Sequence, residues 1–227
     1  MKIKRKLMVI LMFSLLVTAC SGSGGLAPLP APLASEDSSF GVDKNINMET
    51  IDNYLDREDV AYRDVRMLFD PADYAAVGGD ADLSKTITGF KIVPYPYIGT
   101  LPELPVDGAY QDQTLFTVDW APTGEILSAK PLFKESMMIL KELFPQDQAI
   151  FIMCGGAGYS QMVKDLLIFL GWDETKLYNT GANWGYTGKN SLELIVYPED
   201  ANDDKIYALW RADYAQILFD KLNLIND

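Results

Sequence analysis

The stretch that decides the fold is IFIMCGGAGYSQMV, residues 150–163, in which an unbroken apolar run reaches Cys154 and three of the next four residues are glycine. The apolar run is typical of a strand buried on both faces of a parallel sheet. The following segment SQMVKDLLIFLGW, residues 160–172, has the pattern of a strongly apolar helix that stops near Gly171. The pattern therefore predicts Cys154 at the carboxyl end of a central strand, where open α/β sheets carry their sites.

The loop CGGAGYS predicts a backbone that curls around an anion. Glycine permits positive φ values, for which Gly156 is the candidate, and lets successive N–H groups point inward against the positive end of the next helix. A Cys154 thiolate there would be stabilised, with its pKa lowered without any basic side chain. Ser160 fits the N-cap of the helix. The alternative is an ordinary strand-to-helix turn with an incidental cysteine.

Strand and helix patterns alternate along the rest of the chain, which predicts one α/β domain over residues 46–227. The domain is expected to have a central, mainly parallel sheet with helices on both faces. Residues 100–130 lack helical periodicity and are expected to form an insertion that includes a hairpin. The expected elements are a short helix over 47–59, strands over 61–68, 90–98, 176–179 and 192–197, a helix over 130–144, and a final amphipathic helix over 204–225.

The first residues have the features of an export signal. MKIKRK is followed by the apolar run LMVILMFSLLVTA and then by Cys20, and the run is too short for a comfortable membrane span. We therefore predict a signal peptide over residues 1–19, with an uncleaved anchor as the alternative. The sequence V-T-A-C resembles the lipobox of bacterial lipoproteins, which implies that Cys20 is acylated. Residues 20–45, rich in Gly, Ser, Pro and Ala, then predict a flexible tether.

Composition excludes several classes of function. The chain has no histidine, so Ser-His-Asp hydrolysis, Cys-His proteolysis and His-ligated zinc are excluded, and no metal site is expected. Its 32 acidic residues against 19 basic ones make nucleic acid a poor partner. The sequence has two cysteines, so lipidation of Cys20 leaves Cys154 without a disulfide partner. An unpaired thiol outside the cytosol suggests use, although a buried inert cysteine is the alternative.

Three segments in order resemble rhodanese-like domains. YLDREDVAYRDVRMLFDPADY, which contains Asp64-Val65-Arg66, resembles their opening helix and strand, and AIFIMCGGAGYSQMVKDLLIFLGW and KLYNTGANWGY resemble their active-site segment and the one beyond it. The resemblance covers residues 46–190, interrupted by the insertion. It implies sulfur transfer through a persulfide on Cys154 without a cofactor. The implied substrate-binding residues are Gly155, Gly156, Ala157, Gly158, Tyr159 and Ser160, with Trp184 at the pocket mouth.

The loop departs from the family pattern at its sixth position, where members that use anionic donors often carry arginine and this chain has Tyr159. An uncharged loop argues against phosphoryl transfer and against thiosulfate as an efficient donor. Tyr159 is expected either to rim the pocket or to pack on the insertion. Asp64 and Arg66 are expected to form a structural pair that supports the loop, and Trp184 has core packing as its alternative.

Two functions remain open from the sequence. The first is a sulfurtransferase that takes sulfur from a small donor and passes it to a thiol or cyanide. The second is a non-catalytic rhodanese-like module that binds a protein of the cell envelope. In both, the domain is expected to be exported and held at the bacterial membrane by the lipid anchor.

Overall fold

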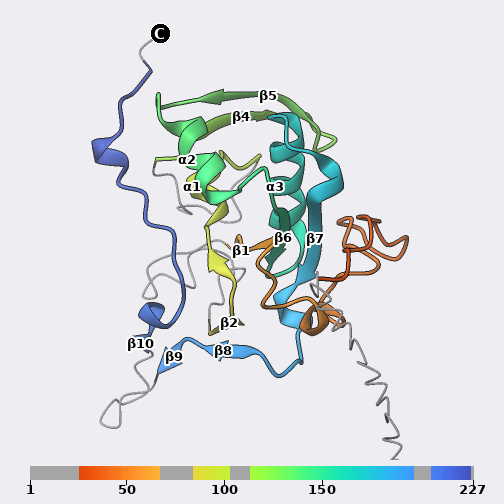
Figure 1. Ribbon diagram of the computed structural model, residues 1–227. Coiled ribbons are helices and arrows are strands. Elements are labelled where there is room, and N and C mark those ends of the chain that lie inside the picture. Colours follow the sequence, from red (N-terminus) through yellow and green to blue (C-terminus); the bar gives the residue numbers. More distant parts are fainter. Residues whose placement is uncertain (1–25, 67–83, 103–112, 197–205, 226–227) are drawn as a thin grey trace, which may run out of the picture.

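The computed structural model describes residues 26–66, 84–102, 113–196 and 206–225 (Figure 1). Its centre is a four-stranded sheet in the order β3-β1-β6-β7, with all three strand pairs parallel. The strands are β1 (Val60–Asp64), β3 (Lys91–Ile92), β6 (Ala149–Cys154) and β7 (Leu177–Ala182). The expected α/β class and parallel sheet are confirmed. The predicted signal peptide and Cys20 lie outside the described residues, as do residues 103–112 of the predicted insertion.

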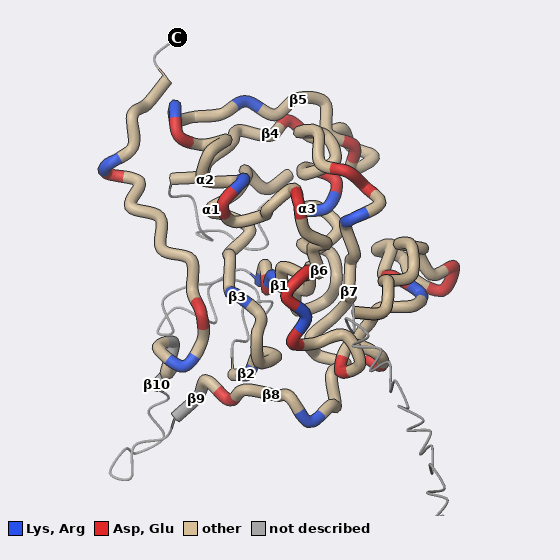
Figure 2. The backbone as a smooth tube through the Cα atoms, in the orientation of Figure 1, with Lys and Arg blue, Asp and Glu red and all other residues tan. Residues whose placement is uncertain are grey.

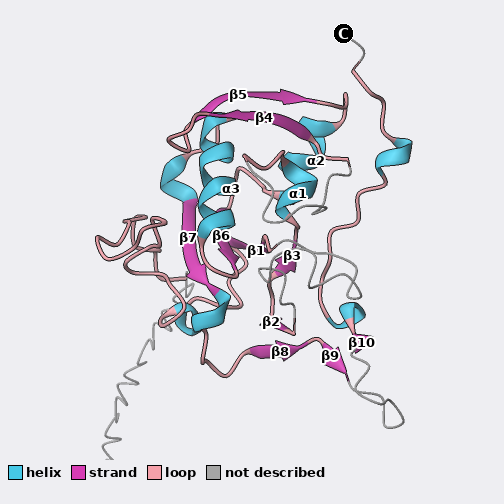
Figure 3. Ribbon diagram, turned by 180° about the vertical axis from the view of Figure 1, so that it is seen from behind, coloured by secondary structure: helices cyan, strands magenta, loops and turns pink. Residues whose placement is uncertain are grey.

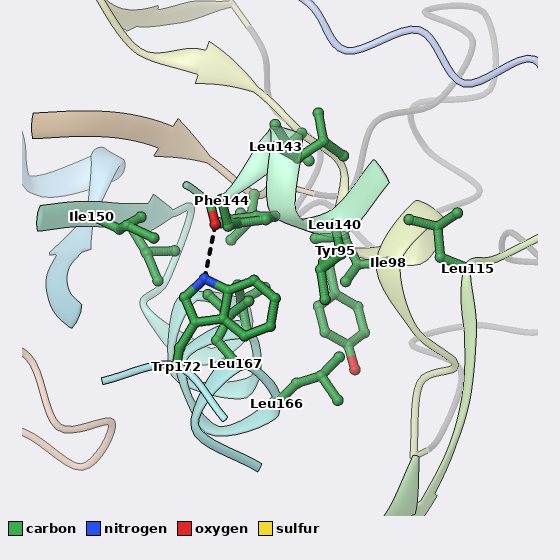
Figure 4. Close-up of a cluster of buried hydrophobic side chains, with 14 of the residues drawn as sticks. Tyr95, Ile98, Leu115, Leu140, Leu143, Phe144, Ile150, Leu166, Leu167 and Trp172 are labelled. Atoms are coloured by element: carbon green, nitrogen blue, oxygen red, sulfur yellow. Dashed lines mark hydrogen bonds between the residues drawn. The ribbon is translucent and has the colours of Figure 1, made fainter. Parts of the chain in front are cut away.

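Helices cover one face of the sheet. From β6, Ile150, Ile152 and Cys154 point into this layer, as alternation along a strand requires. The layer contains α1 (Tyr95–Ile98), α2 (Ser136–Leu143) and α3 (Gly158–Phe169). Figure 4 shows its core, where the Trp172 indole donates a hydrogen bond of 2.8 Å to the carbonyl of Phe144. This bond fastens the end of α3 to the end of α2.

The hairpin expected within the insertion is confirmed. Strands β4 (Phe116–Trp120) and β5 (Ile126–Pro131) pair antiparallel, and in Figure 1 they run across the end of the helical layer. Val118 is buried in the same core as α3, with Trp120 and Ile126 packed against it. The described hairpin of the insertion is therefore part of the helical layer.

The opposite face is covered by irregular chain, which corrects the expectation of helices on both faces. Among the described residues, the three α-helices all contribute to the layer that contains Cys154. On the opposite face of the sheet, Phe151 and Met153 of β6 pack with Ile46 and Ile51. The helix expected over 47–59 is reduced to the single 3₁₀ turn Ile51–Asn53. Its continuation is broken at Asp56, whose φ of 59° lies outside the right-handed helical region.

Residues 26–45 differ from the expected flexible tether, because they are hydrogen-bonded to the domain. Asp43 donates its N–H to the carbonyl of Asn179 at 2.7 Å, and the Tyr178 hydroxyl donates to the carbonyl of Pro30 at 2.8 Å. The Asp43 carboxylate, 2% exposed, accepts hydrogen bonds from the N–H groups of Leu33 and Ile46. The buried carboxylate thus holds the segment in a folded form, and the Asp43 backbone attaches it to β7.

The prediction of a helix over residues 204–225 is wrong. The segment is extended, with β10 (Ile206–Tyr207) and the 3₁₀ turns Leu209–Arg211 and Phe219–Lys221, as Figure 3 shows. Its backbone bonds to the edge strand β3: Ile92 donates to the carbonyl of Asp213 at 2.7 Å, and Ala215 donates to the carbonyl of Ile92 at 2.8 Å. An edge strand leaves backbone groups unpaired, and satisfying them favours an extended segment over a helix.

Short antiparallel pairs complete the described fold. β2 (Lys85–Ile87) pairs with β8 (Ser191–Glu193), and β9 (Ile195–Val196) pairs with β10. The strand expected over 192–197 is thus present as β8 and β9, while the segment 90–98 divides into β3 and α1. Across the described residues, none of the helices has both the length and the apolar character that crossing a membrane requires.

A buried ion pair joins β1 to its neighbours. Asp64 and Arg66 have side chains with 0% exposure and approach to 2.5 Å. Thr86 donates its hydroxyl to Asp64 at 2.9 Å, and Arg66 donates to the carbonyl of Lys85 at 2.8 Å. The pair therefore ties β1 to β2.

We predict that Asp64→Ala lowers the free energy of unfolding by about 3–5 kcal/mol, because it leaves the Arg66 charge buried without its partner. The control is Asp59→Ala, which removes the surface pair between Asp59 and Arg57 and should change stability by less than about 1 kcal/mol. Urea unfolding of both variants measures the difference. Equal effects would contradict the structural role of the buried pair.

Candidate functional site

Cys154 is the last residue of β6, and its side chain faces the beginning of α3. It is 1% exposed and belongs to the helical layer's core. The backbone N–H groups of Tyr159 and Ser160, in the first turn of α3, act on the Cys154 thiol in the direction that lowers its pKa. First-turn N–H groups have no partner within the helix, so they are available to a sulfur atom that lies at the helix N-terminus.

Burial raises the pKa of the Cys154 thiol above its usual value. The N–H groups of Ser160 and Tyr159 act in the opposite direction, as does the Ser160 hydroxyl when it donates to the sulfur, while the nearby charge of Asp64 adds to the increase. The predicted lowering of the pKa is therefore wrong. The sequence pattern correctly suggests helix N–H groups at the sulfur, but it carries no information on how little water reaches it, and desolvation is the larger effect.

The loop curls at a different residue from the one expected. Positive φ occurs at Ala157, at 73°, and Gly156 has no such φ. A Cβ at Gly156 would lie 3.4 Å from the Trp184 ring, which is an ordinary van der Waals contact, so neither the backbone nor the space requires glycine at this position. Ala157 is also the N-cap of α3, so Ser160 does not cap the helix as expected; it lies buried inside the first turn.

A pocket of about 390 Å³ opens beside Cys154. Four of the predicted site residues besides Cys154 line it: Gly156, Gly158, Tyr159 and Trp184. Phe40 and Met162 complete the described lining, and all of these residues are uncharged. Gly155, Ala157 and Ser160 do not line it. The tube in Figure 2 shows charged residues spread over most of the described elements, in contrast to this uncharged pocket.

Aromatic side chains form the walls. Trp184 is 52% exposed and Phe40 is 49% exposed, so both present ring surface to solvent at the pocket. Tyr159 stacks on Tyr95 of α1, with ring centroids 5.7 Å apart and an angle of 16° between the planes. Tyr159 therefore rims the pocket while it packs on α1. Trp184 lies at the pocket and not in the core.

Phe40 is a site residue that the sequence does not predict, because it belongs to the segment expected to be a tether. It comes to the pocket because the side-chain amide of Asn179 donates a hydrogen bond of 2.7 Å to its carbonyl. Trp184 is held from another direction. Its backbone N–H donates to the carbonyl of Gly155 at 3.5 Å, and the side chain of its neighbour Asn183 accepts a hydrogen bond from Arg66. The Asp64–Arg66 pair thus supports the Trp184 turn, which in turn contacts the cysteine loop.

Asn179 and Ser160 form a buried polar pair beneath the loop. Both are 0% exposed, and Ser160 Oγ lies 2.7 Å from Asn179 Oδ1 and 3.7 Å from Cys154 Sγ. The sequence does not predict Asn179 either, since a single amide within a strand gives no pattern. Among the residues that the structure describes, no cluster of three His, Cys, Asp or Glu side chains could hold a metal ion.

Comparison of the chain with protein-family models, with curated proteins and with solved structures finds no match. The chemistry of the site is therefore argued from its own geometry.

We predict that alkylation of Cys154 by iodoacetamide is slow at neutral pH and accelerates as the pH rises through a midpoint above that of an exposed cysteine. The reason is that the thiolate reacts and the raised pKa keeps the thiol protonated until higher pH. Site-resolved mass spectrometry measures the rate. An exposed cysteine introduced by Ser39→Cys is the internal reference, and a Cys154 midpoint at or below it would show that burial does not control the thiol.

Proposed function

We propose that the protein is a rhodanese-like sulfurtransferase that carries sulfur as a persulfide on Cys154 and takes it from a sulfane donor that bears an apolar organic group. The observation that carries the proposal is a sulfur atom at a helix N-terminus and beside a pocket whose described lining is aromatic and uncharged. A pocket of about 390 Å³ has room for a small organic donor.

The reaction consists of two displacements at sulfur. The Cys154 thiolate attacks the outer sulfur of an alkyl or aryl persulfide, the donor's S–S bond breaks, and the donor's thiolate leaves with the bonding electrons. Cys154 then carries the outer sulfur as a persulfide. An acceptor thiolate or cyanide attacks that sulfur, the new S–S bond breaks, and the Cys154 thiolate is restored, so the cycle has no net oxidation.

The electrostatics of the site favour the persulfide over the thiolate. The Cys154 Sγ is buried, which disfavours a charge on it. In the persulfide the charged outer sulfur extends one bond length beyond Sγ, toward the pocket and away from the desolvated position. The N–H groups of Tyr159 and Ser160 remain available as hydrogen-bond donors.

The uncharged lining also sets the donor class. Thiosulfate would bring its sulfonate oxygens into a pocket where the described walls offer no cation, so its charge would lose hydration without compensation. An apolar group instead gains by contact with Phe40, Trp184 and Met162. The lack of a cation in the described pocket lining also opposes phosphoryl transfer.

The family and location belong to the same proposal. The parallel sheet and the strand, glycine loop and helix around Cys154 support a rhodanese-like domain. The lipobox-like sequence at Cys20 supports export and lipid anchoring at the bacterial membrane, with the domain held near the anchor by its docked segment 26–45.

A second candidate function is a binding module without catalysis. The observation that favours it is the burial of Cys154, which raises the thiol pKa and leaves the aromatic walls as the exposed part of the site. In this case the pocket holds an apolar group of an envelope partner, and the thiol never reacts.

We predict that incubation with freshly generated benzyl hydropersulfide adds one sulfur atom to the Cys154 peptide, while thiosulfate at equal concentration adds little. Peptide mass spectrometry measures the loading, and Cys154→Ser is the control for sulfur bound elsewhere. Loading by neither donor would favour the binding module. Equal or better loading by thiosulfate would show that a cation reaches the pocket and would contradict the proposed donor class.

Removal of an aromatic wall should slow loading selectively. Trp184→Ala is expected to lower the rate with benzyl hydropersulfide by roughly tenfold, because it deletes a large apolar contact. Trp210→Ala is the matched control, since Trp210 is 86% exposed and does not line the pocket. Unchanged loading in Trp184→Ala would exclude this ring from donor binding.

A further inference from the structure

The side-chain amide of Asn179 has its orientation determined from both ends. Its Nδ2 donates to the carbonyl of Phe40 at 2.7 Å and to that of Ala157 at 3.3 Å. Its Oδ1 accepts from the N–H of Gly181 at 3.1 Å. A flipped amide would place the carbonyl oxygen against two other carbonyl oxygens and its NH₂ group against an N–H, so the flip is excluded.

This orientation decides where the proton of the Ser160 hydroxyl goes. A serine has one hydroxyl proton, and three acceptors surround Ser160 Oγ: Asn179 Oδ1 at 2.7 Å, the carbonyl of Ala157 at 2.8 Å, and Cys154 Sγ at 3.7 Å. The two oxygen atoms are closer and are better acceptors than sulfur. The proton is therefore held on the side of Asn179 and Ala157, and the lone pairs of Ser160 Oγ are left facing Cys154.

We infer that Asn179 is a positioning residue that turns Ser160 into a hydrogen-bond acceptor for the Cys154 thiol, so that the site rests with its sulfur protonated. In this arrangement the Cys154 S–H donates to Ser160 Oγ. The first-turn N–H groups of α3 are directed at the same sulfur, and they become its partners when the proton leaves.

The charged and titratable groups around the sulfur are consistent with a protonated resting state. From β1, the charge of Asp64 acts against the thiolate, and Arg66 is hydrogen-bonded to that carboxylate. From α3 and α1 come the phenols of Tyr159 and Tyr95, which stack on each other. Burial raises the pKa of the Tyr95 phenol, so this group is neutral at physiological pH.

The same amide connects the thiol to the pocket wall. Asn179 contacts Ser160 through Oδ1 and the backbone of Phe40 through Nδ2. A ligand that displaces Phe40 therefore acts on the group that orients Ser160. This inference deepens the proposed function, and its meaning for catalysis rests on that function, but its test requires no sulfur donor.

The test is the pH profile of Cys154 alkylation by iodoacetamide in single and double variants. Ser160→Ala removes the acceptor of the thiol proton, so the midpoint should move to lower pH and the rate at neutral pH should increase several-fold. Asn179→Ala removes the nearer of the two oxygen acceptors and leaves only the carbonyl of Ala157 to compete for the Ser160 proton, so the hydroxyl donates to the thiolate more often and the midpoint should also decrease. In the Ser160→Ala background, Asn179→Ala should add nothing further, because there is no hydroxyl to reorient.

Asn179→Asp tests the part played by Phe40. It keeps an oxygen acceptor for Ser160 but loses the donor to Phe40, and its buried negative charge also opposes the thiolate, so its midpoint should rise. A decrease equal to that of Asn179→Ala would assign the effect to a displaced Phe40 and overturn the inference. A higher midpoint in Ser160→Ala would also overturn it, because Ser160 would then be a donor to the thiolate. Should Asn179→Ala not fold, Asn179→Val, which also lacks the oxygen acceptor and suits a strand, takes its place in the same comparison.

Discussion

Cys154 Sγ lies where β6 ends and α3 begins, and at 1% exposure it is almost fully removed from water. Desolvation disfavours a charge on this sulfur, whereas the N–H groups of the first turn of α3 favour one. The balance between desolvation and these N–H groups determines the protonation state of Cys154 and therefore its reactivity. A group that reacts with Cys154 must accommodate a thiol that is neutral at rest, and the described pocket lining, which is uncharged, offers it mainly aromatic and apolar contacts.

The pocket depends on two segments that are far apart in the sequence. Phe40 belongs to the docked N-terminal segment and is held by Asn179 of β7. Trp184 follows β7 and is held through Asn183 by the buried pair of Arg66 and Asp64. Both anchors are hydrogen bonds donated by fully buried side chains, Asn179 and Arg66, so the aromatic walls are fixed by the sheet rather than by each other. This preorganisation reduces the ordering cost of binding an apolar ligand.

The central part of the fold could be predicted because its pattern is local. The sequence predicts β6, the loop and α3 from three neighbouring patterns: continuous apolar residues before Cys154, glycines after it, and an apolar helical pattern beyond them. The final segment could not be predicted in this way. Its apolar spacing also suits a helix, and only the presence of the unpaired edge of β3 makes the extended form favourable.

The site was predictable in identity but not in electrostatics. Cys154, Tyr159 and Trp184 line the pocket. The sequence could predict them because the glycine loop and the segment after β7 have recognisable patterns. Phe40 and Asn179 depend on long-range contacts that no local pattern encodes. The direction of the Cys154 pKa shift could not be predicted for the same reason, since the water around a thiol is determined by every element that packs on it.

The central claim is that Cys154 both receives a sulfur atom and passes it on. Its most direct test is to load the protein with benzyl hydropersulfide, remove the excess donor, and add cyanide. Sulfur transfer predicts release of thiocyanate equimolar with the loaded Cys154, together with return of the free thiol in the same peptide. Thiocyanate below the amount of loaded protein, with the extra sulfur remaining on Cys154, would contradict a transfer function and identify the loaded cysteine as a dead end.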